Sequence, residues 1–413
     1  MDLTSAATAH EGYDRMRFAM VGCGYVADFY AKTLPNHSNL TLAGVFDKDL
    51  DRGRGFAKRY GVSCYSSLDE VLRDPDLHLV ANLTNPRSHY AITKAALEAG
   101  KHVYTEKPLA MGLREAKELV ELAEERGLLV SGAPCNVLSE SAQTLWKAMR
   151  EGLIGKPRRA YAELDDEVIF KDYRKWANEV GIPWPYQDEF ETGCTLEHAG
   201  YYLGWLTTFF GPAKRISSFG SVLFPDKGEL IGCGTPDFTV GCIEFESGTV
   251  ARITCSIHTN RDHSFRVFGD EGTLAVSDGW DYGAPVYVDR QVPKSWRERH
   301  PNRARFLGMS RPSVPLVRPA HFVCYKDSHK MDVSRGIAEM ASAVAENRQP
   351  RLSARWLLHM TELALAISSC EPQYELSTTF EPMEPMPWAV GMQDWRRGTD
   401  QVGQCLDVSN PMP

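Results

Sequence analysis

The chain has 413 residues, of which 43% are hydrophobic and 24% charged, and its formal net charge is −8. This length accommodates two domains of common size, and the acidic balance argues against a nucleic-acid-binding protein, which ordinarily presents a basic face. The sequence contains no apolar run approaching a membrane span, no C-x-x-C pair and no Cys/His cluster with zinc-ligand spacing. We therefore expect a cytoplasmic protein with reduced cysteines and no metal site.

Residues 16–140 are predicted to form a dinucleotide-binding Rossmann domain, preceded by a disordered extension over residues 1–15. The pattern alternates strands and helices, as in a parallel sheet covered by helices. The predicted strands are 17–21, 40–46, 79–83, 102–105 and 128–131. The predicted helices are 26–33, 50–60, 68–73, 88–99 and 113–126.

Residues 141–370 are predicted to form a second, α+β domain with a largely antiparallel open sheet, so the overall fold class is α/β. Its predicted strands are longer and alternating: 159–164, 215–223, 238–246, 250–258, 264–269, 273–276 and 286–290. Its predicted helices are 141–151, 333–346 and 354–369. The tail, residues 371–413, is predicted to be extended and peripheral.

A glycine-rich turn, Val21-Gly-Cys-Gly-Tyr-Val-Ala27, lies between the first predicted strand and helix. In such a G-x-G-x-x-A turn, Gly22 permits the tight turn and Gly24 lets the backbone approach a pyrophosphate. Asp47, about twenty residues after Ala27, ends the second strand, where a carboxylate accepts hydrogen bonds from the adenosine ribose. The pattern predicts a nicotinamide dinucleotide site.

An anionic Asp47 disfavours a 2′-phosphate, so NAD is the expected cofactor. NADP is not excluded, because Lys48 and Arg52 would partly offset that repulsion. We expect further cofactor contacts from the rest of the turn and from two strand ends: Cys23, Tyr25, Val26, Thr84, Asn85, Glu106 and Lys107. For the Thr84–Asn85 loop, an ordinary strand-to-helix connection is an equal alternative, and His89 in the helix that follows is expected to be structural.

Lys107 is the strongest candidate catalytic residue. In Glu106-Lys107-Pro108 it follows the predicted strand 102–105, and ligands bind at the carboxyl edge of such sheets. An ammonium there can take or return the proton of a substrate hydroxyl while hydride moves to or from the cofactor. By itself, a lysine before a proline is more often a solvated strand end, so the prediction depends on the surrounding motifs.

The turn, Asp47 and Glu106-Lys107-Pro108, taken in this order and spacing, resemble the glucose-fructose oxidoreductase, inositol dehydrogenase and MocA (Gfo/Idh/MocA) family. The segments 265–274 and 335–339 are also similar to that family's carboxyl-terminal domain, and the resemblance covers about residues 16–370. It implies NAD(P)-dependent oxidation or reduction of a sugar, cyclitol or related polyol. It also implies a homo-oligomer, a dimer or tetramer, assembled through the carboxyl-terminal sheet.

The family places an aspartate and, four residues later, a histidine on a helix that faces the nicotinamide. In the matching segment 193–204, Glu197 takes the aspartate position and Tyr201 the histidine position. Residues four apart share one helix face, whereas His198 is turned by about 100° from that face and is expected to point elsewhere. If gaps shift the register of the match, His198 instead becomes a substrate residue. A neighbouring Lys107 cation is expected to lower the pKa of Tyr201 and make its phenol a usable acid or base.

The segment 176–190 is the candidate for substrate binding. It interleaves aromatic residues, Trp184 and Tyr186 among them, with carboxylates, a combination that suits a sugar; packing into the domain core is an equal alternative. The basic segment 294–330 could recognise an anionic substrate or reach a second subunit, although a solvated insertion is favoured.

Three functions are compatible with the sequence. The first is an NAD(P)-dependent oxidoreductase acting on a secondary alcohol of a sugar, cyclitol or glycoside. The second is a redox-neutral NAD-dependent glycosidase, in which transient oxidation acidifies the adjacent C–H and permits elimination. The third is a non-catalytic NAD-binding sensor, against which the lysine at position 107 argues.

Overall fold

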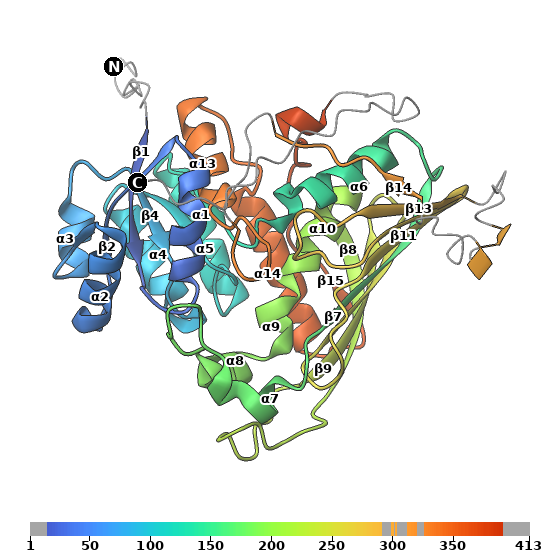
Figure 1. The fold of residues 1–413 in the computed structure, drawn as a ribbon, viewed down its shortest axis with the longest axis horizontal. Helices are drawn as coiled ribbons and strands as arrows, with labels where there is room; N and C mark the ends of the chain where they lie inside the picture. The colour runs from blue at the N-terminus through green and yellow to red at the C-terminus, as the bar shows by residue number, and fades with distance from the viewer. Residues whose placement is uncertain (1–14, 291–298, 301, 304–311, 320–325, 391–413) are drawn as a thin grey trace.

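The computed structural model describes residues 15–290, 299–300, 302–303, 312–319 and 326–390 (Figure 1). Within them, the amino-terminal part contains a six-stranded parallel sheet with the order β3-β2-β1-β4-β5-β6. Its strands are β1 (Met16–Val21), β2 (Leu40–Phe46), β3 (Ser63–Cys64), β4 (Leu79–Asn82), β5 (His102–Thr105) and β6 (Val130–Gly132). The predicted Rossmann sheet is confirmed, and only the two-residue β3 was not predicted.

The helices that cover this sheet follow the predicted periodicity closely. They are α1 (Ala27–Thr33), α2 (Leu50–Tyr60), α3 (Leu68–Arg73), α4 (His89–Glu98) and α5 (Leu113–Glu125). In α5, the side chains buried on the sheet are Ala116, Leu119, Val120 and Ala123, a stripe with a 3.6-residue period. The Asp49 side chain caps α2 by accepting the Arg52 N–H.

The chain order of this sheet reverses at β1, which has β2 on one side and β4 on the other. Ligands of open α/β sheets bind in the crevice outside the carboxyl ends of the strands at such a point. The turn after β1, Asp47 after β2 and Lys107 after β5 all lie at these carboxyl ends. The topology therefore gathers the predicted cofactor and catalytic residues at one edge of the sheet.

The second part is built on a nine-stranded sheet among the described residues, with the order β14-β13-β12-β11-β7-β10-β9-β8-β15. Its strands are β7 (Pro157–Asp165), β8 (Ala213–Ser221), β9 (Phe238–Phe245), β10 (Val250–Ser256), β11 (Phe265–Gly269), β12 (Gly272–Val276), β13 (Val286–Arg290), β14 (Ser313–Val314) and β15 (Tyr374–Glu375). Strands β7 and β10 pair in parallel, and the other pairs are antiparallel, as predicted.

Helices lie along one side of this second sheet, between it and the Rossmann part (Figure 1). They are α6 (Glu140–Arg150), α9 (Cys194–His198), α10 (Gly200–Phe210) and α14 (Ala354–Ser368). The short helices α7 (Ile169–Asp172) and α8 (Tyr186–Thr192), which were not predicted, lie at the lower edge of Figure 1. Along β10, buried and more exposed side chains alternate, so one face of the sheet packs against helices.

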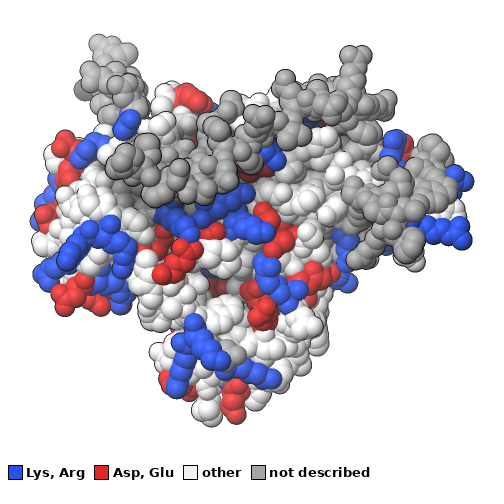
Figure 2. Space-filling model, viewed as in Figure 1, with Lys and Arg blue, Asp and Glu red and all other residues white. Residues whose placement is uncertain are grey.

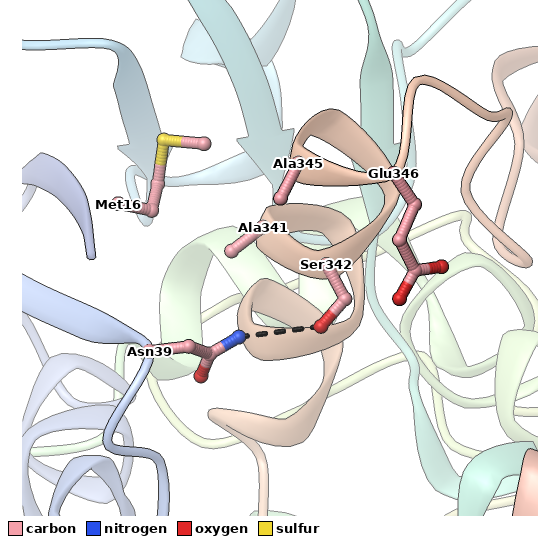
Figure 3. Close-up of a pocket in the computed structure, with 6 residues that line it drawn as sticks. All are labelled: Met16, Asn39, Ala341, Ser342, Ala345 and Glu346. Atoms are coloured by element: carbon pink, nitrogen blue, oxygen red, sulfur yellow. Dashed lines mark hydrogen bonds between the residues drawn. The ribbon is translucent and has the colours of Figure 1, made fainter. Parts of the chain in front are cut away.

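Helix α13 (Arg335–Ala345) lies beside the Rossmann strands, although the sequence assigns it to the second domain (Figure 1). Its side chains Ile337 and Met340 share one core with Phe18 and Met20 of β1. Figure 3 shows a small pocket there, where Asn39 Nδ2 donates to Ser342 Oγ at 3.3 Å. This pocket borders the amino end of β1, at the opposite edge from the crevice.

The described part of the tail contacts the body of the protein. Strand β15 pairs with β8, and Phe380 and Met383 are buried, so residues 374–383 are extended but not peripheral. Apart from Arg15, the predicted extension 1–15 lies outside the described residues. The tail beyond residue 390 also lies outside them. Among the helices that are described, none has the length and apolarity needed to cross a membrane.

Candidate active site

A cavity of about 250 Å³ lies at the carboxyl edge of the Rossmann sheet and is lined by residues of both domains. Tyr25, Tyr30 and Lys107 line it from the Rossmann part, and His198 and Tyr201 from the second. Figure 2 shows this face of the molecule hollowed between the two parts, with acidic and basic side chains interspersed around the hollow. Two of the three candidate catalytic residues, Lys107 and Tyr201, thus line one cavity, and the third, Glu197, contacts Lys107 without lining it.

Lys107 forms a buried ion pair with Glu197. The Nζ to Oε2 distance is 2.6 Å, and the two side chains are 18% and 2% exposed. Burial is the largest single effect and would lower the pKa of Lys107, but the neighbouring groups, Glu197 first among them, together outweigh it and hold this pKa well above its ordinary value. Lys107 is therefore held as an ammonium in the cavity, where it can donate a hydrogen bond to a ligand.

Glu189 of α8, which also lines the cavity, extends this pair. Burial and the neighbouring Glu197 carboxylate raise the pKa of Glu189 well above its ordinary value, whereas Lys107 holds the pKa of Glu197 low. Glu197 Oε1 is buried and accepts no N–H or hydroxyl from the described residues. A protonated Glu189 supplies the missing donor, so the three groups form a chain of one cation, one anion and one neutral acid.

The environment of Tyr201 corrects a prediction. The Lys107 cation does act to lower the pKa of this phenol, but burial is the larger effect and raises it well above its ordinary value. Tyr201 therefore remains a neutral phenol, which can donate a hydrogen bond to a ligand in the cavity. The sequence shows that a lysine is near, but not how completely the ring is enclosed.

His198 corrects a second prediction, because it lines the same cavity instead of pointing elsewhere. Helix α9 ends at His198 and α10 begins at Gly200, so His198 and Tyr201 lie on successive short helices, and the cavity reaches both. His198 Nε2 lies 3.0 Å from Oδ2 of Asp166, which directly follows β7. His198 therefore lines the candidate cavity together with Tyr201.

The glycine turn has the geometry that a pyrophosphate requires. Gly22 has φ +98°, and a Cβ there would lie 2.6 Å from the Leu83 carbonyl oxygen, so only glycine fits. A Cβ on Gly24 would meet nothing within 4 Å, which leaves open space beside the backbone. Cys23 is buried, and its backbone N–H donates to Asp47 Oδ2 at 2.8 Å. The turn and the acidic residue are thus fixed to each other.

Asp47 is buried and accepts a second backbone hydrogen bond, from Asp49 to Oδ1, at 2.8 Å. Each carboxylate oxygen retains lone-pair capacity for a ribose hydroxyl. Arg52 Nη1 lies 3.7 Å from Asp47 Oδ2, and Lys48 is exposed. These residues fit a bound NAD, with Asp47 toward the ribose and the Gly22–Gly24 turn toward the pyrophosphate.

The remaining predicted cofactor residues surround the same edge. Tyr25, Val26 and Glu106 line the cavity, and Glu106 Oε1 accepts the Tyr30 hydroxyl at 2.6 Å. Thr84 donates to Asn82 Oδ1, and the exposed Asn85 donates to Asp188 of α8.

His89 is structural, as predicted. Its ring is fully buried, with Nδ1 2.7 Å from the Pro108 carbonyl oxygen and Nε2 2.8 Å from that of Thr84. It thereby joins the Thr84 loop to the Lys107 loop.

The two aromatic residues predicted to bind substrate, Trp184 and Tyr186, lie in different places. Trp184 lines the cavity together with Trp176, and their ring centroids are 5.6 Å apart. Tyr186 does not line it; its hydroxyl donates to Glu229 at 2.8 Å and its ring packs on Tyr173. Its position near the start of α8 directs Tyr186 toward Glu229, so its role in substrate binding stays a prediction that this cavity does not support.

Sequence reasoning missed several lining residues, chiefly Asp166, Trp280, Arg261 and His329. They come from segments that are distant in the chain, and no local spacing marks them. The basic segment 294–330 lies largely outside the described residues; of its described end, His329 lines the cavity. In the part of the chain that is described, no group of three or more His, Cys, Asp or Glu residues could hold a metal ion.

Comparison with known proteins identifies two family models along the chain. Residues 16–133 match the oxidoreductase family, NAD-binding Rossmann fold, and residues 142–275 match the Gfo/Idh/MocA carboxyl-terminal domain. Among curated proteins, trans-1,2-dihydrobenzene-1,2-diol dehydrogenase from Mus musculus is 24% identical, with 64% of this chain and 75% of that protein covered. The uncharacterized oxidoreductase YfiI from Bacillus subtilis is 29% identical, with coverages of 64% and 70%.

Solved structures share the fold at low sequence identity. A levoglucosan dehydrogenase in complex with NADH and levoglucosan aligns with a TM-score of 0.72 at 16% identity, covering 88% of this chain and 99% of that one. The WlbA dehydrogenase from Bordetella pertussis, in complex with NADH and UDP-GlcNAcA, aligns with a TM-score of 0.66 at 17% identity, with coverages of 88% and 98%.

Proposed function

The chain belongs to the Gfo/Idh/MocA family of oxidoreductases and carries its NAD-binding Rossmann domain, and on that premise we propose that it interconverts a secondary alcohol and a carbonyl of a sugar-like molecule. The observation that carries the proposal is the Lys107 ammonium, which lies in a cavity at the carboxyl edge of the sheet together with the Tyr201 phenol. The names of the relatives, which are dehydrogenases of sugars and of a diol, support the substrate class.

NAD supplies hydride acceptance and donation, and the residues that would hold it are the Gly22–Gly24 turn and Asp47. The chain's own residues would bind the substrate oxygen and move its proton. In the reducing direction, Lys107 donates its proton to the oxygen as negative charge develops there, and oxidation reverses this transfer. Glu197 holds the ammonium in place, and Tyr201 donates a second hydrogen bond to the same oxygen.

Substrate recognition would use the aromatic wall formed by Trp176 and Trp184, on which the C–H face of a sugar ring can pack. We further propose a homo-oligomer that assembles through the outer face of the nine-stranded sheet. Phe219 on β8 and Val250 on β10 are apolar side chains that are 62% and 48% exposed. A monomeric mass in multi-angle light scattering would contradict this assembly.

The proposed activity is tested with a panel of sugars, cyclitols and glycosides, each supplied with NAD or NADP while absorbance at 340 nm and aglycone release are followed. We expect NADH formation with at least one free polyol or glycoside. Lys107→Ala should lower turnover by about 10²- to 10⁴-fold, the usual contribution of a general acid or base. Undiminished turnover of this variant would exclude the mechanism.

The second candidate is a redox-neutral NAD-dependent glycosidase, and His198 beside Asp166 in the cavity favours it, because elimination after oxidation needs a further base. Such an enzyme would release aglycone and leave NAD unchanged at the end of the reaction. A sensor would bind NAD and do neither, so the same panel separates all three functions.

A further inference from the structure

The segment 176–192 of the second domain joins the two sides of the crevice in which the Rossmann part would hold NAD. This crevice lies between the loops that follow β1 and β4, the neighbouring strands at which the strand order reverses. One end of the segment contacts α1, which follows the β1 loop, and the other end, in α8, contacts the loop after β4 (Figure 1). We call residues 176–192 the clasp.

The clasp is attached to the Rossmann residues that follow the glycine turn. The Asn178 amide donates to Asp28 Oδ2 at 2.9 Å and to the Tyr25 carbonyl oxygen at 3.1 Å, and Asn178 and Asp28 are only 6% and 5% exposed. Lys32, one turn further along α1, pairs with Glu179 at 2.6 Å. A hydrogen bond to a buried carboxylate is stronger than a pair at the surface, so Asn178 is the main attachment on this side.

The contacts on the β4 side come from α8. The Asn85 side chain, in the loop after β4, donates to Asp188, and Arg87 pairs with Glu191 at 3.2 Å. Both contacts lie at the surface, so they hold the clasp less strongly than the buried contact of Asn178 does. The clasp is thus attached on both sides of the crevice, and most firmly to α1.

The first half of the clasp is a compact turn with its own hydrogen bonds. The backbone N–H of Trp184 donates to the Trp176 carbonyl oxygen at 2.9 Å, and that of Asn178 donates to the Ile182 carbonyl oxygen at 2.9 Å. The side-chain oxygen of Asn178 accepts the backbone N–H groups of Val180 and Ile182. Because these backbone groups are paired within the turn, this half can leave the Rossmann surface as a unit without losing those bonds.

The second half of the clasp is packed on its own domain. The Phe190 ring of α8 is buried and lies 6.1 Å from the Tyr173 ring, and Thr235 Oγ1 donates to the Glu191 carbonyl oxygen at 3.1 Å. These contacts do not involve the Rossmann part. Detachment of the clasp from α1 and from the loop after β4 therefore leaves α8 on the second domain.

The clasp spans the nicotinamide end of the cofactor site. Trp176, Trp184 and Glu189 of the clasp line the cavity together with Lys107, and the reacting end of the cofactor must lie in that cavity. Asp47, which would hold the adenosine ribose, follows β2, on the other side of β1 from β4. A ligand that fills the adenosine end alone therefore does not pass beneath the clasp.

We propose that the clasp controls exchange of the cofactor. The nicotinamide half of NAD or NADH enters and leaves only after residues 176–192 have detached from α1 and from the loop after β4. Because detachment precedes both entry and release, a weaker clasp speeds both steps. A residue that only contacted the bound cofactor would change the release rate alone, so the two rates together identify a clasp.

The test measures association and dissociation rates by stopped-flow fluorescence, with NADH as the full cofactor and etheno-ADP as a ligand of the adenosine end. For dissociation, the loaded protein is mixed with an excess of NAD⁺ or of ADP. Asn178→Ala should raise both rates of NADH about tenfold or more, the effect of a lost hydrogen bond to a buried charged group. The rates of etheno-ADP should stay within about twofold of wild type.

A second variant leaves the buried contacts intact. Glu179→Gln combined with Glu191→Gln removes the two exposed pairs and should raise both NADH rates about twofold to fivefold. The matched control is Glu124→Gln, which removes an exposed pair with Arg355, at 2.7 Å, between α5 and α14 at the amino edge of the sheet. This control should leave all rates unchanged.

Two results would overturn the inference: wild-type NADH rates in Asn178→Ala, or an equal change in the rates of NADH and etheno-ADP. If Asn178→Ala does not fold, the double variant decides, and unchanged NADH rates in it refute the clasp. These measurements need no substrate. Absence of turnover with the whole sugar panel would therefore refute the proposed function and leave this inference standing.

Discussion

Glu197→Gln is the most informative single substitution for the Lys107 site. It removes one negative charge and preserves the shape of a side chain that is 2% exposed. At 2.6 Å, the attraction between Lys107 Nζ and Glu197 Oε2 is about 6 kcal/mol at an effective dielectric constant of about 20. This attraction keeps Lys107 protonated against the effect of burial, so its loss lowers the pKa of Lys107.

Two consequences can be measured. Breaking a buried ion pair by removing one partner costs about 3–5 kcal/mol, so the free energy of unfolding in urea should fall toward that range. Turnover in the carbonyl-reducing direction, followed as NADH consumption with the best substrate of the panel, should fall about 10²- to 10³-fold, because the proton donor is lost. The Kd of NAD should stay within about threefold, since Asp47 and the glycine turn are untouched.

The matched control is Glu118→Gln. Lys94 and Glu118 form a pair of similar length, 2.5 Å, but their side chains are 35% and 39% exposed. A surface pair contributes at most about 1 kcal/mol, so this variant should retain its stability and turnover. If Glu197→Gln kept turnover within threefold of wild type, the Lys107 ammonium would not be the proton donor.

Three further predictions concern other parts of the site. Gly24→Ala should leave thermal stability unchanged but raise the Kd of NAD about tenfold or more. Gly22→Ala should instead lower the free energy of unfolding by about 1–3 kcal/mol. Equal effects in the two variants would contradict the turn geometry. Glu189→Gln retains a donor for Glu197 and should keep turnover within about threefold, and Glu189→Ala should lose about tenfold or more. Burial raises the pKa of Asp327 to about 7, so the folded state binds more protons than the unfolded state between pH 4 and 7, and stability falls as pH rises. The free energy of unfolding of Asp327→Asn, relative to wild type, should therefore increase by about 2–3 kcal/mol from pH 5 to pH 8 in denaturant titrations; no change would mean that Asp327 ionises normally.

Local patterns were sufficient to predict the Rossmann elements and the place of Lys107. The apolar residues of α5 from Ala116 to Ala123 recur with the 3.6-residue period of a helix that packs on a sheet. The parallel strand that ends at Thr105 places the residues after it at the carboxyl edge of the sheet, where ligands bind. These features depend on residues close in sequence. Because strands and helices alternate along the chain, their order is then enough to predict most of the parallel sheet.

The parts that could not be predicted depend on contacts between distant segments. Asp166, His198 and His263 meet because β7, α9 and the loop before β11 converge at one cavity, and no spacing rule connects them. The pKa of Tyr201 was predicted with the wrong sign because burial, which only the folded structure provides, outweighs the Lys107 charge. The amphipathic pattern of α13 shows that it packs, but not on which sheet.

The way the two domains are joined bears on how the cavity admits a substrate. The buried pair between Arg335 and Glu140, at 3.1 Å, anchors α13, which packs on the Rossmann sheet, to α6, and Asp332 holds the same guanidinium at 3.2 Å. Separating α13 from α6 would leave the charges of the Arg335–Glu140 pair without each other, at about 3–5 kcal/mol.

The α8 side of the cavity is held differently. Its pairs with the Rossmann part, Arg87 with Glu191 and Lys32 with Glu179, are exposed, and such pairs contribute at most about 1 kcal/mol each. The same segment also has a buried attachment, because the Asn178 amide donates to Asp28 Oδ2 at 2.9 Å and to the Tyr25 carbonyl oxygen at 3.1 Å. The wall that carries Trp176 and Trp184 is therefore held to the Rossmann part by buried as well as exposed contacts.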